Sequence, residues 1–443
     1  MTKKQTLARR IVQADRLYYG WIILAASFLS VFFSAPGQTY FTSVFIESYV
    51  KEFGWSRSAL SSMYSAATIL SGTLLFFVGR LADKYGQKKI LLIAITLIGF
   101  SSFWTSNVTM LWMIFVGFFV GRITGQGTMT MIPAIVLPGW FHKRRALAFS
   151  LMAMGGAAGS AIVPPFNAYL INLIGWRMTW RVWMLIMWLV LLPIMVVFFR
   201  NKPEDVGLSI EDEQKQRAKK DSFINRIFSK TTPGVSKKSI HAEVNFDARQ
   251  AVRTSAFWGT VFVQMLFPMI GTGLTFHFVS VMTQRGVDEV RTPFLLSIIA
   301  VTTLISSLLN GFIFTKISAK TGSVLIAINM SAAVIIVLAV NSFPAAVFYA
   351  LIQGYGNGMM AVWGGIVWPE YFGTRHLGSI RGLATTCMVI ASALGPLPLG
   401  LSFDYFGRHE QALYFFLAMS LTGIVVALLC KRPKPPIRYK NEY

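Results

Sequence analysis

The chain has 443 residues, of which 54% are hydrophobic and 13% are charged, and its mean hydropathy is +0.56. This composition excludes the set of soluble domains that the length alone would suggest, and it indicates a membrane protein. The formal net charge of +23 does not point to nucleic acid, because the basic residues lie between apolar runs. No basic stripe with interleaved aromatic residues and no nucleic-acid motif is present.

Apolar runs divide the sequence into about twelve candidate membrane spans. Their approximate ranges are 20–46, 58–78, 88–107, 110–136, 146–173, 178–199, 255–283, 293–314, 322–341, 343–367, 381–403 and 411–430. These lengths suit a bilayer core, which roughly 20 helical residues can cross. Backbone groups in lipid must form hydrogen bonds within their own segment, so the spans are expected to be helices. The sequence therefore predicts an all-α membrane protein.

Basic residues are distributed unequally between the two sides of these spans. The N-terminus, the loops after even-numbered spans and the C-terminus hold 33 of the 41 Lys and Arg residues, and the opposite loops hold 7. By the positive-inside rule this asymmetry predicts a multi-pass protein of the cytoplasmic (inner) membrane with both termini in the cytoplasm. The first apolar run lacks the short hydrophobic region and the small-residue cleavage site of a signal peptide, which favours a retained membrane span.

One long polar interval separates six spans from six. The expected organisation is an N-terminal bundle at 1–199, a cytoplasmic linker at 200–253, and a C-terminal bundle with a cytoplasmic tail at 254–443. A weak repeat supports duplication, since Gly155-x-x-x-Gly159 in the fifth span has a counterpart in Ala391-x-x-x-Gly395 in the eleventh. Two pseudo-symmetric six-helix bundles with a midplane cavity between them follow from this reading.

Two local features concern the linker and the thiols. Asp247 precedes residues 248–254 and is expected to cap a short helix there. Cys387 and Cys430 lie within apolar runs and are expected to be free. No metal-ligand cluster, nucleotide-binding loop or nucleophile constellation is visible, so neither a cofactor nor an enzymatic activity is expected.

A polar stretch at residues 79–89 joins the second and third spans. Gly79 and Gly86 would permit a tight loop, Asp83 can pair with a cation or a helix end, and Lys88 and Lys89 are among the cations that hold the loop on one side. The spacing G-x-L-A-D-x-x-G-x-K-K resembles the loop between the second and third helices of major facilitator superfamily transporters. The resemblance implies alternating access and a conformational gating role for these five residues.

Further segments resemble the bacterial monocarboxylate porter and oxalate–formate antiporter branch of that superfamily. They are Tyr18-Tyr19-Gly20-Trp21, Phe53-Gly54-Trp55-Ser56-Arg57, Arg200-Asn201-Lys202-Pro203-Glu204-Asp205-Val206-Gly207-Leu208, and the run from Phe372 to Gly382. The resemblance implies a gradient-driven carrier, by symport or antiport, of a small organic anion such as a monocarboxylate. Partners other than the solute and lipid would be protons, and a monomer is expected.

The branch's usual anion-binding groups are absent from the corresponding positions. The eighth-helix arginine position falls near Gly311, the acid one turn earlier near Ser307, and the first-helix lysine near Thr39. Arg122 and His277 would have to replace them, or the substrate is not a simple monocarboxylate.

Arg122 is the strongest single signal within a span. An arginine near the middle of a membrane helix costs at least ~2.5 kcal/mol on insertion scales, so it is expected to face the bundle interior, a partner or a water-filled cavity. Arg122-x-x-x-Gln126-Gly127 resembles the superfamily's fourth-helix arginine motif. A structural arginine that is satisfied by carbonyls and amides is the alternative.

Other polar or aromatic residues within spans are candidates for a substrate site. A Pro36-Gly37 pair is expected to loosen the first helix and to free backbone carbonyls there. The candidate substrate-binding residues, Arg122 included, are Gln38, Tyr40, Arg122, Gln126, Asn167, Gln264, His277, Tyr355, Asn357 and Trp363. Packing against neighbouring helices is the alternative for the residues of the tenth span, and a neutral interfacial histidine is the alternative for His277.

Three other functions stay open at this point. An uncharged aromatic cavity would suit efflux of amphiphilic compounds. A non-transporting receptor could signal through residues 200–253, although the interval is short and carries no partner motif. A membrane-embedded enzyme is disfavoured, because paired catalytic groups are missing.

Overall fold

The computed structural model describes residues 18–141, 145–206, 246–314, 316–373 and 377–433. In the first half of the chain the helices are α2 (Gly20–Phe32), η1 (Ala35–Gly37), α3 (Thr39–Thr42), α4 (Ile46–Phe53), α5 (Arg57–Tyr85), α6 (Gln87–Ser106), α7 (Leu111–Gly121), η2 (Arg122–Thr128), α8 (Met129–Trp140), α9 (Arg145–Leu185), η3 (Ile186–Leu191), α10 (Leu192–Phe198) and η4 (Pro203–Val206). In the second half they are α12 (Ala248–Val252), α13 (Ser255–Phe276), α14 (Phe278–Gln284), α15 (Thr292–Ile313), α16 (Ala319–Ala339), α17 (Phe343–Phe372), α18 (Leu377–Leu394), α19 (Pro396–Phe406) and α20 (Glu410–Leu429).

These helices confirm the predicted all-α fold, and each predicted span coincides with a helical segment. Among the described residues, seven segments are long and apolar enough by themselves to cross a membrane. One of them, Ala148–Phe198, contains 51 residues, enough for two crossings. Gly175, at φ 78° and ψ 160°, breaks α9 between these two crossings.

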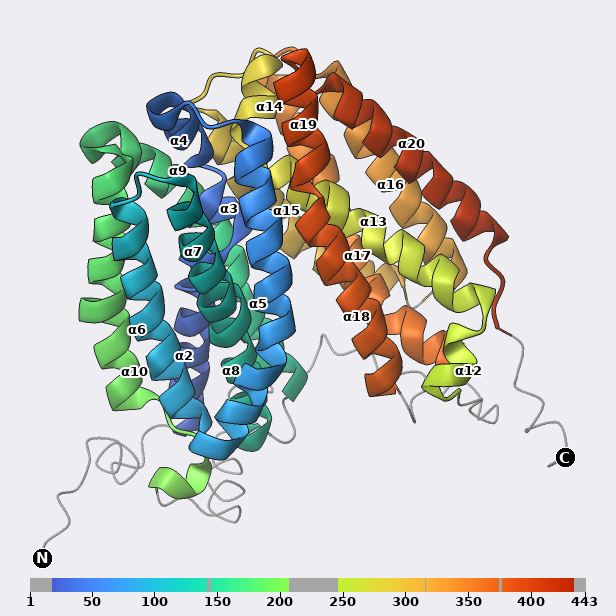
Figure 1. Cartoon of the computed structure of the whole chain (residues 1–443). Helices are drawn as coiled ribbons and strands as arrows, with labels where there is room; N and C mark the ends of the chain where they lie inside the picture. The colour runs from blue at the N-terminus through green and yellow to red at the C-terminus, as the bar shows by residue number, and fades with distance from the viewer. Residues whose placement is uncertain (1–17, 142–144, 207–245, 315, 374–376, 434–443) are drawn as a thin grey trace, which may run out of the picture.

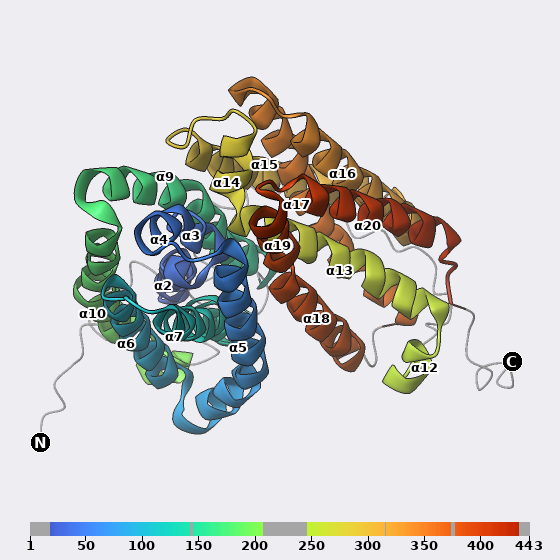
Figure 2. The same cartoon turned by 45° about the horizontal axis from the view of Figure 1, so that its top comes forward.

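The helices form two groups that lie side by side (Figure 1). Helices α2–α10 make the first group, and its apolar core contains residues from Tyr19 to Val206, joined by Phe276 of α13. Helices α12–α20 make the second, whose two apolar clusters lie within residues 246–430. We call these groups the N-bundle and the C-bundle. Figure 2 shows the same separation from a second direction.

Each bundle contains a first helix that is broken and closely packed against a later one. In the N-bundle, a Cβ on Gly159 would lie 3.2 Å from the Phe32 carbonyl oxygen. In the C-bundle, a Cβ on Gly395 would lie 2.1 Å from the Met269 carbonyl oxygen. Only glycine permits such backbone contact. Corresponding positions of the weak sequence repeat thus make equivalent helix–helix contacts.

Helix breaks follow these close contacts. The first span is interrupted at Ala35–Gly37, as the Pro36-Gly37 pair predicts, and its last segment α4 extends beyond the predicted end at residue 46. The seventh span is interrupted at His277 and the eleventh at Gly395. Irregular backbone at membrane depth is tolerated where protein or a polar cavity surrounds it, so we expect these breaks to face the interior of the molecule.

The predicted loop at residues 79–89 is wrong in its extent. Helix α5 continues to Tyr85, so Gly79 lies within a helix, and the turn is made by Gly86 alone at φ 92°. Lys88 and Lys89 already belong to α6. The Lys88 backbone N–H donates to Asn201 Oδ1 (2.7 Å) and its Nζ to the Val196 carbonyl (2.6 Å), which docks the turn on its own bundle.

Most of the predicted linker lies outside the described residues, and so does the side chain of Asp83. At the linker's end, Asp247 caps α12 as predicted, and Gln250 completes a reciprocal capping box. The gating role of residues 79–89, Asp83 included, stays a prediction.

We predict that Gly37→Ala destabilises the protein by about 1–3 kcal/mol, the usual cost of overpacking. A Cβ there would lie 2.1 Å from the Gly121 carbonyl oxygen and 2.8 Å from the Gln126 backbone nitrogen, neither of which can move independently. Thermal unfolding of the purified protein measures the effect. The control is Gly365→Ala in α17, which meets no atom within 4 Å and should be neutral or stabilising by up to about 1 kcal/mol. Equal effects of the two substitutions would contradict the packing argument.

Candidate functional site

Arg122 lies at the junction between the regular helix α7 and the π-helical segment η2. Its side chain is only 4% exposed. The guanidinium donates from Nε to Thr68 Oγ1 (3.1 Å) and from Nη1 to the Gly37 carbonyl (3.3 Å). All of these partners are neutral, and among the described residues no carboxylate forms an ion pair with Arg122.

The aromatic ring of Tyr64 completes the surroundings of Arg122. The guanidinium carbon lies 4.8 Å from the ring centroid, within cation–π distance. The Tyr64 hydroxyl lies 2.5 Å from Thr39 Oγ1, which in turn is 3.4 Å from Arg122 Nη1. Because a guanidinium keeps its charge even when buried, the site holds a positive charge that neutral groups position but do not cancel.

A cavity of about 340 Å³ opens beside this arginine, between the two bundles. We call it the arginine cavity. Its walls come from α5 and η2 of the N-bundle and from α13 and α18 of the C-bundle. The lining residues are Thr68, Ser71, Gly72, Leu75, Arg122, Gln126, Gly127, Pro268, Thr385, Met388, Val389 and Ser392.

A second cavity, of about 400 Å³, lies between α3 and α9 on one side and α13, α15 and α17 on the other. We call it the amide cavity after three of its side chains, Gln38, Gln353 and Asn357. Its lining residues are Gln38, Thr39, Tyr40, Ala157, Ser160, Phe267, Pro268, Gly271, Thr272, Thr275, Leu296, Ile299, Ala300, Thr303, Tyr349, Gln353 and Asn357. Both cavities lie in the size range of small-molecule sites.

Five of the predicted substrate-binding residues line these cavities: Gln38, Tyr40, Arg122, Gln126 and Asn357. The other five line neither of these two cavities, and their role in substrate binding stays a prediction. Trp363 donates to the Ala319 carbonyl (2.9 Å) within the C-bundle core, and Tyr355 packs against the same apolar cluster.

Asn167 and Gln264 serve similar structural purposes inside their own bundles. Asn167 Oδ1 accepts a hydrogen bond from Trp183 (2.7 Å), and Gln264 Oε1 accepts one from Trp368 (3.2 Å). A buried indole N–H needs an acceptor, and these amides supply it. They are packing residues rather than cavity residues.

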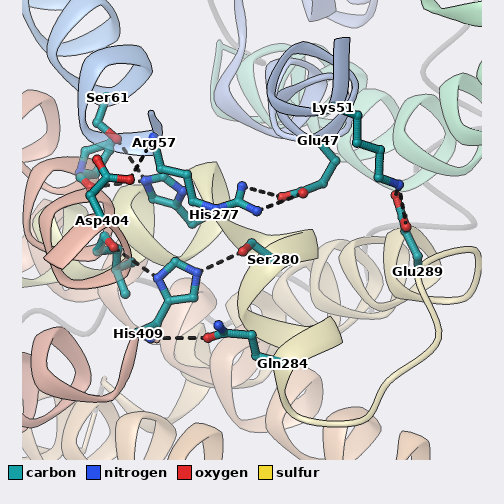
Figure 3. Close-up of polar contacts among 12 residues, drawn as sticks. Glu47, Lys51, Arg57, Ser61, His277, Ser280, Gln284, Glu289, Asp404 and His409 are labelled. Carbon is teal, nitrogen blue, oxygen red and sulfur yellow. Dashed lines mark hydrogen bonds and ion pairs between the residues drawn. The ribbon is translucent and has the colours of Figure 1, made fainter. Parts of the chain in front are cut away.

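At the end of the molecule that carries α4, α14 and the start of α20, the bundles are closed against each other. Arg57 begins α5 and forms a bidentate ion pair with Glu47 (2.6 and 2.9 Å), as Figure 3 shows. The guanidinium also lies 4.4 Å from the ring centroid of Phe403 in the C-bundle. A bidentate arginine–carboxylate pair has fixed geometry, so Arg57 is held in position against the other bundle.

Asp404 of α19 binds the N-terminal end of α5. Its Oδ1 and Oδ2 accept the backbone N–H groups of Arg57 (3.1 Å) and Ser58 (2.8 Å) (Figure 3). The first N–H groups of a helix lack intrahelical partners and favour a negative charge. The C-bundle carboxylate therefore caps an N-bundle helix.

Gly400, one turn before Asp404, allows this approach. A Cβ at Gly400 would lie 2.9 Å from the Ser58 Cα and 3.0 Å from the Arg57 carbonyl carbon. Further along α5, the Ser65 hydroxyl donates to the Ala393 carbonyl (2.5 Å). We call this set of contacts between α5 and the C-bundle, together with the Glu47 pair, the seal. The ion pair between Lys51 and Glu289 (2.9 Å) joins the bundles at its edge.

His277, predicted as a substrate residue, belongs to the seal instead. Its Nε2 lies 2.8 Å from Ser61 Oγ of the N-bundle and 3.2 Å from the Pro396 carbonyl oxygen (Figure 3). The ring is 1% exposed and lines neither cavity. The second ring nitrogen, Nδ1, is buried and has no hydrogen-bond partner among the residues that the structure describes.

His409 lies beside it, between α19 and α20, with ring centroids 5.6 Å apart. Its Nδ1 donates to the Leu399 carbonyl (3.0 Å) and its Nε2 accepts from the Ser280 hydroxyl (2.9 Å), as a neutral imidazole can. Burial lowers the pKa of His409 from 6.5 to about 4, and the positive charge of Arg57 acts in the same direction. The imidazole is thus neutral at physiological pH.

The sequence prediction missed Arg57, Asp404 and Gly400. Nothing in a single span indicates that Asp404 meets a helix 347 positions earlier. The missed polar cavity residues are mostly hydroxyl side chains such as Thr68, Ser71 and Thr272. In a membrane helix these residue types also bond to their own backbone, so they carry little signal.

The fold and sequence can be compared with known proteins. The family model of the Major Facilitator Superfamily matches residues 27–396 and 294–443. Monocarboxylate transporter 2 of Meriones unguiculatus is 26% identical over 428 residues, which cover 93% of this chain and 82% of that protein.

Solved structures share the fold. A bacterial homolog of the human lysosomal transporter Spinster, in an inward-facing and unoccupied conformation, matches with a TM-score of 0.65 at 14% identity, covering 93% of this chain and 95% of that one. The D-xylose–proton symporter matches with a TM-score of 0.66 at 16% identity, covering 95% and 99%. The fold is helical, its two bundles meet around central cavities, and the family model spans most of the sequence. The chain therefore belongs to the Major Facilitator Superfamily of membrane transporters.

Proposed function

We propose that this transporter carries a small organic anion across the cytoplasmic membrane and that Arg122 binds the anionic group. The observation that carries the proposal is a buried guanidinium with only neutral partners, facing a cavity between two bundles. Burying a charge without a counter-charge is expensive. An anion that enters the arginine cavity offsets this cost, whereas a neutral solute does not.

The seal supports alternating access. It closes the bundles together at one end, where α5 and α19 lie side by side, while the far ends of α5 and α18 lie apart (Figures 1 and 2). By the positive-inside rule the chain termini lie in the cytoplasm. The sealed end then faces outward, and the structure represents the inward-facing state. Similarity to a transporter solved in an inward-facing conformation supports this assignment.

Anion exchange follows from the same charge. Moving the empty site through an occluded state would bury Arg122 without compensation, whereas a bound anion neutralises it. The lining of the two cavities contains no Asp, Glu or His among the described residues, so a proton-binding group does not share the site. Gradients of the exchanged anions would drive transport.

An efflux carrier for amphiphilic compounds is the second candidate, because Phe267, Leu296 and Ile299 give the amide cavity an apolar wall. This function would not need Arg122. The two functions therefore differ in their response to the substitution described next.

We predict that Arg122→Gln abolishes anion binding. Formate, acetate, lactate and hexanoate should be tested for stabilisation of the purified protein against heat, since a ligand that binds only the folded state raises the unfolding temperature. Loss of a buried charge partner should reduce affinity at least about tenfold. Arg181→Gln, at a half-buried site where the side chain bonds to residues of its own bundle, is the matched control. Stabilisation that survives in the Arg122 variant, or no stabilisation of the native protein by any of the four, would contradict the proposal.

We predict that exchange outpaces net transport. Proteoliposomes loaded with labelled hexanoate should release it at least about tenfold faster into buffer containing hexanoate than into anion-free buffer, because the empty carrier must bury its charge on the return step. Equal rates under the two conditions would show that the empty carrier reorients freely.

We predict that Gly400→Val opens the seal. The added side chain forces α19 away from the α5 backbone, and a penalty of about 1 kcal/mol or more shifts the population at least about fivefold. The readout is the labelling rate of Ser61→Cys by a membrane-impermeant maleimide, after both native cysteines are replaced by serine. Gly311→Val in α15 meets no atom within 4 Å and should leave the rate unchanged. If Ser61→Cys is labelled equally slowly alone, with Gly400→Val and with Gly311→Val, Gly400 does not hold the bundles together.

A further inference from the structure

The arginine cavity and the amide cavity adjoin each other. Pro268 lines both of them. Thr39 in the amide cavity lies 3.4 Å from Arg122 in the arginine cavity. Thr272 of the amide cavity and Ser392 of the arginine cavity share a hydrogen bond of 2.7 Å. A ligand with an extended chain can therefore contact both compartments.

The charges of the two compartments limit the charge of such a ligand. Arg122 is the only Lys, Arg, Asp, Glu or His side chain that lines either cavity among the described residues. One carboxylate would be compensated by this guanidinium. A second carboxylate on the same molecule would lie in the amide cavity with no cation, and desolvation would then cost several kcal/mol. The site thus favours a monoanion over a dianion of the same length.

The amide cavity offers a matched donor and acceptor. Gln353 Nε2 donates to Asn357 Oδ1 (3.1 Å). This bond leaves the Gln353 amide oxygen and the Asn357 amide nitrogen without a hydrogen bond to any residue that the structure describes. Both residues line the cavity. A hydroxyl or amide group can donate to the former and accept from the latter at once.

The remaining walls suit a hydrocarbon segment between the two ends. Phe267, Leu296 and Ile299 line the amide cavity beside these amides. Cavities of about 400 and 340 Å³ each reach the size that holds drug-sized ligands. A two- or three-carbon acid would occupy only the surroundings of Arg122.

We propose that the two cavities form one site for an extended organic monoanion, whose carboxylate binds Arg122 and whose uncharged hydroxyl or amide end binds Gln353 and Asn357. The inference rests on the proposed function, because it takes Arg122 as the anion-binding group. It adds a selectivity: a terminal hydroxyl is accepted, and a terminal carboxylate is rejected.

The test uses three probes of one chain length, namely hexanoate, ω-hydroxyhexanoate and adipate. Their dissociation constants are measured by titration calorimetry on the purified full-length protein at neutral pH, where each carboxyl group is ionised. We expect ω-hydroxyhexanoate to bind about fivefold more tightly than hexanoate, as one neutral hydrogen bond provides, and adipate to bind most weakly. Adipate as the tightest ligand would overturn the inference.

Substitutions in the amide cavity separate this selectivity from anion binding. Asn357→Leu should remove the preference for ω-hydroxyhexanoate over hexanoate, whereas Asn341→Leu on the exposed surface should leave that preference unchanged. Gln353→Lys adds a second cation and should place adipate above ω-hydroxyhexanoate. This gain cannot arise from misfolding.

The outcomes distinguish the two proposals. If Arg122→Gln abolishes binding of all three acids but Asn357→Leu and Gln353→Lys leave their order unchanged, the anion site stands and the extended site is wrong. If Arg122→Gln leaves all three affinities unchanged, the proposed function itself is wrong.

Discussion

The positive charge of Arg122, held between two bundles without a counter-charge, is the constraint on which the rest of the structure depends. A guanidinium in a membrane interior must be surrounded by acceptors or by water. Here the chain supplies them by irregular backbone: the break at Ala35–Gly37 presents the Gly37 carbonyl, and the π-helical segment begins at Arg122 itself. These two departures from regular helix thus lie next to the one charge that needs partners.

Close backbone packing offsets part of the free-energy cost of these departures from regular helix. A Cβ on Gly125 would lie 2.8 Å from the Ser34 carbonyl oxygen and 2.9 Å from the Gly37 Cα, so the broken first helix rests directly on the fourth. Without side chains at this contact, van der Waals packing compensates for interrupted helical hydrogen bonds. In the C-bundle the first helix α13 instead rests on the eleventh span, where a Cβ on Gly273 would lie 2.5 Å from the Gly395 carbonyl oxygen.

The fold could be predicted from sequence because its determinants are local. Apolar run length fixes the spans, Pro36-Gly37 marks a break, and Asp247 identifies a cap. The end of α5 was misjudged because polar residues at 79–85 resemble a loop, yet a membrane helix can extend past the hydrocarbon into water without losing its hydrogen bonds.

The site was predicted only in part, for a physical reason. Arg122 could be identified because its insertion cost singles it out in any span. Asn167, Gln264 and Trp363 could not be separated from cavity residues, since each is polar or aromatic and the direction it faces depends on how its helix rotates against neighbours. Contacts such as Asp404 with the end of α5 join positions 347 residues apart, and no periodicity in a single sequence encodes such a pairing.

The central charge and the seal are physically connected through Tyr64. Its hydroxyl bonds Thr39 beside Arg122, and its ring lies 4.5 Å from that of Phe276 in the C-bundle. Phe276 immediately precedes His277, whose ring bonds Ser61 in the seal. An anion that draws Arg122 away from Thr39 and Tyr64 would therefore disturb packing at the base of the seal. If the site binds an anion as proposed, its occupancy and closure of the sealed end would be coupled by contact between neighbouring side chains, because the two bundles meet there through aromatic contacts.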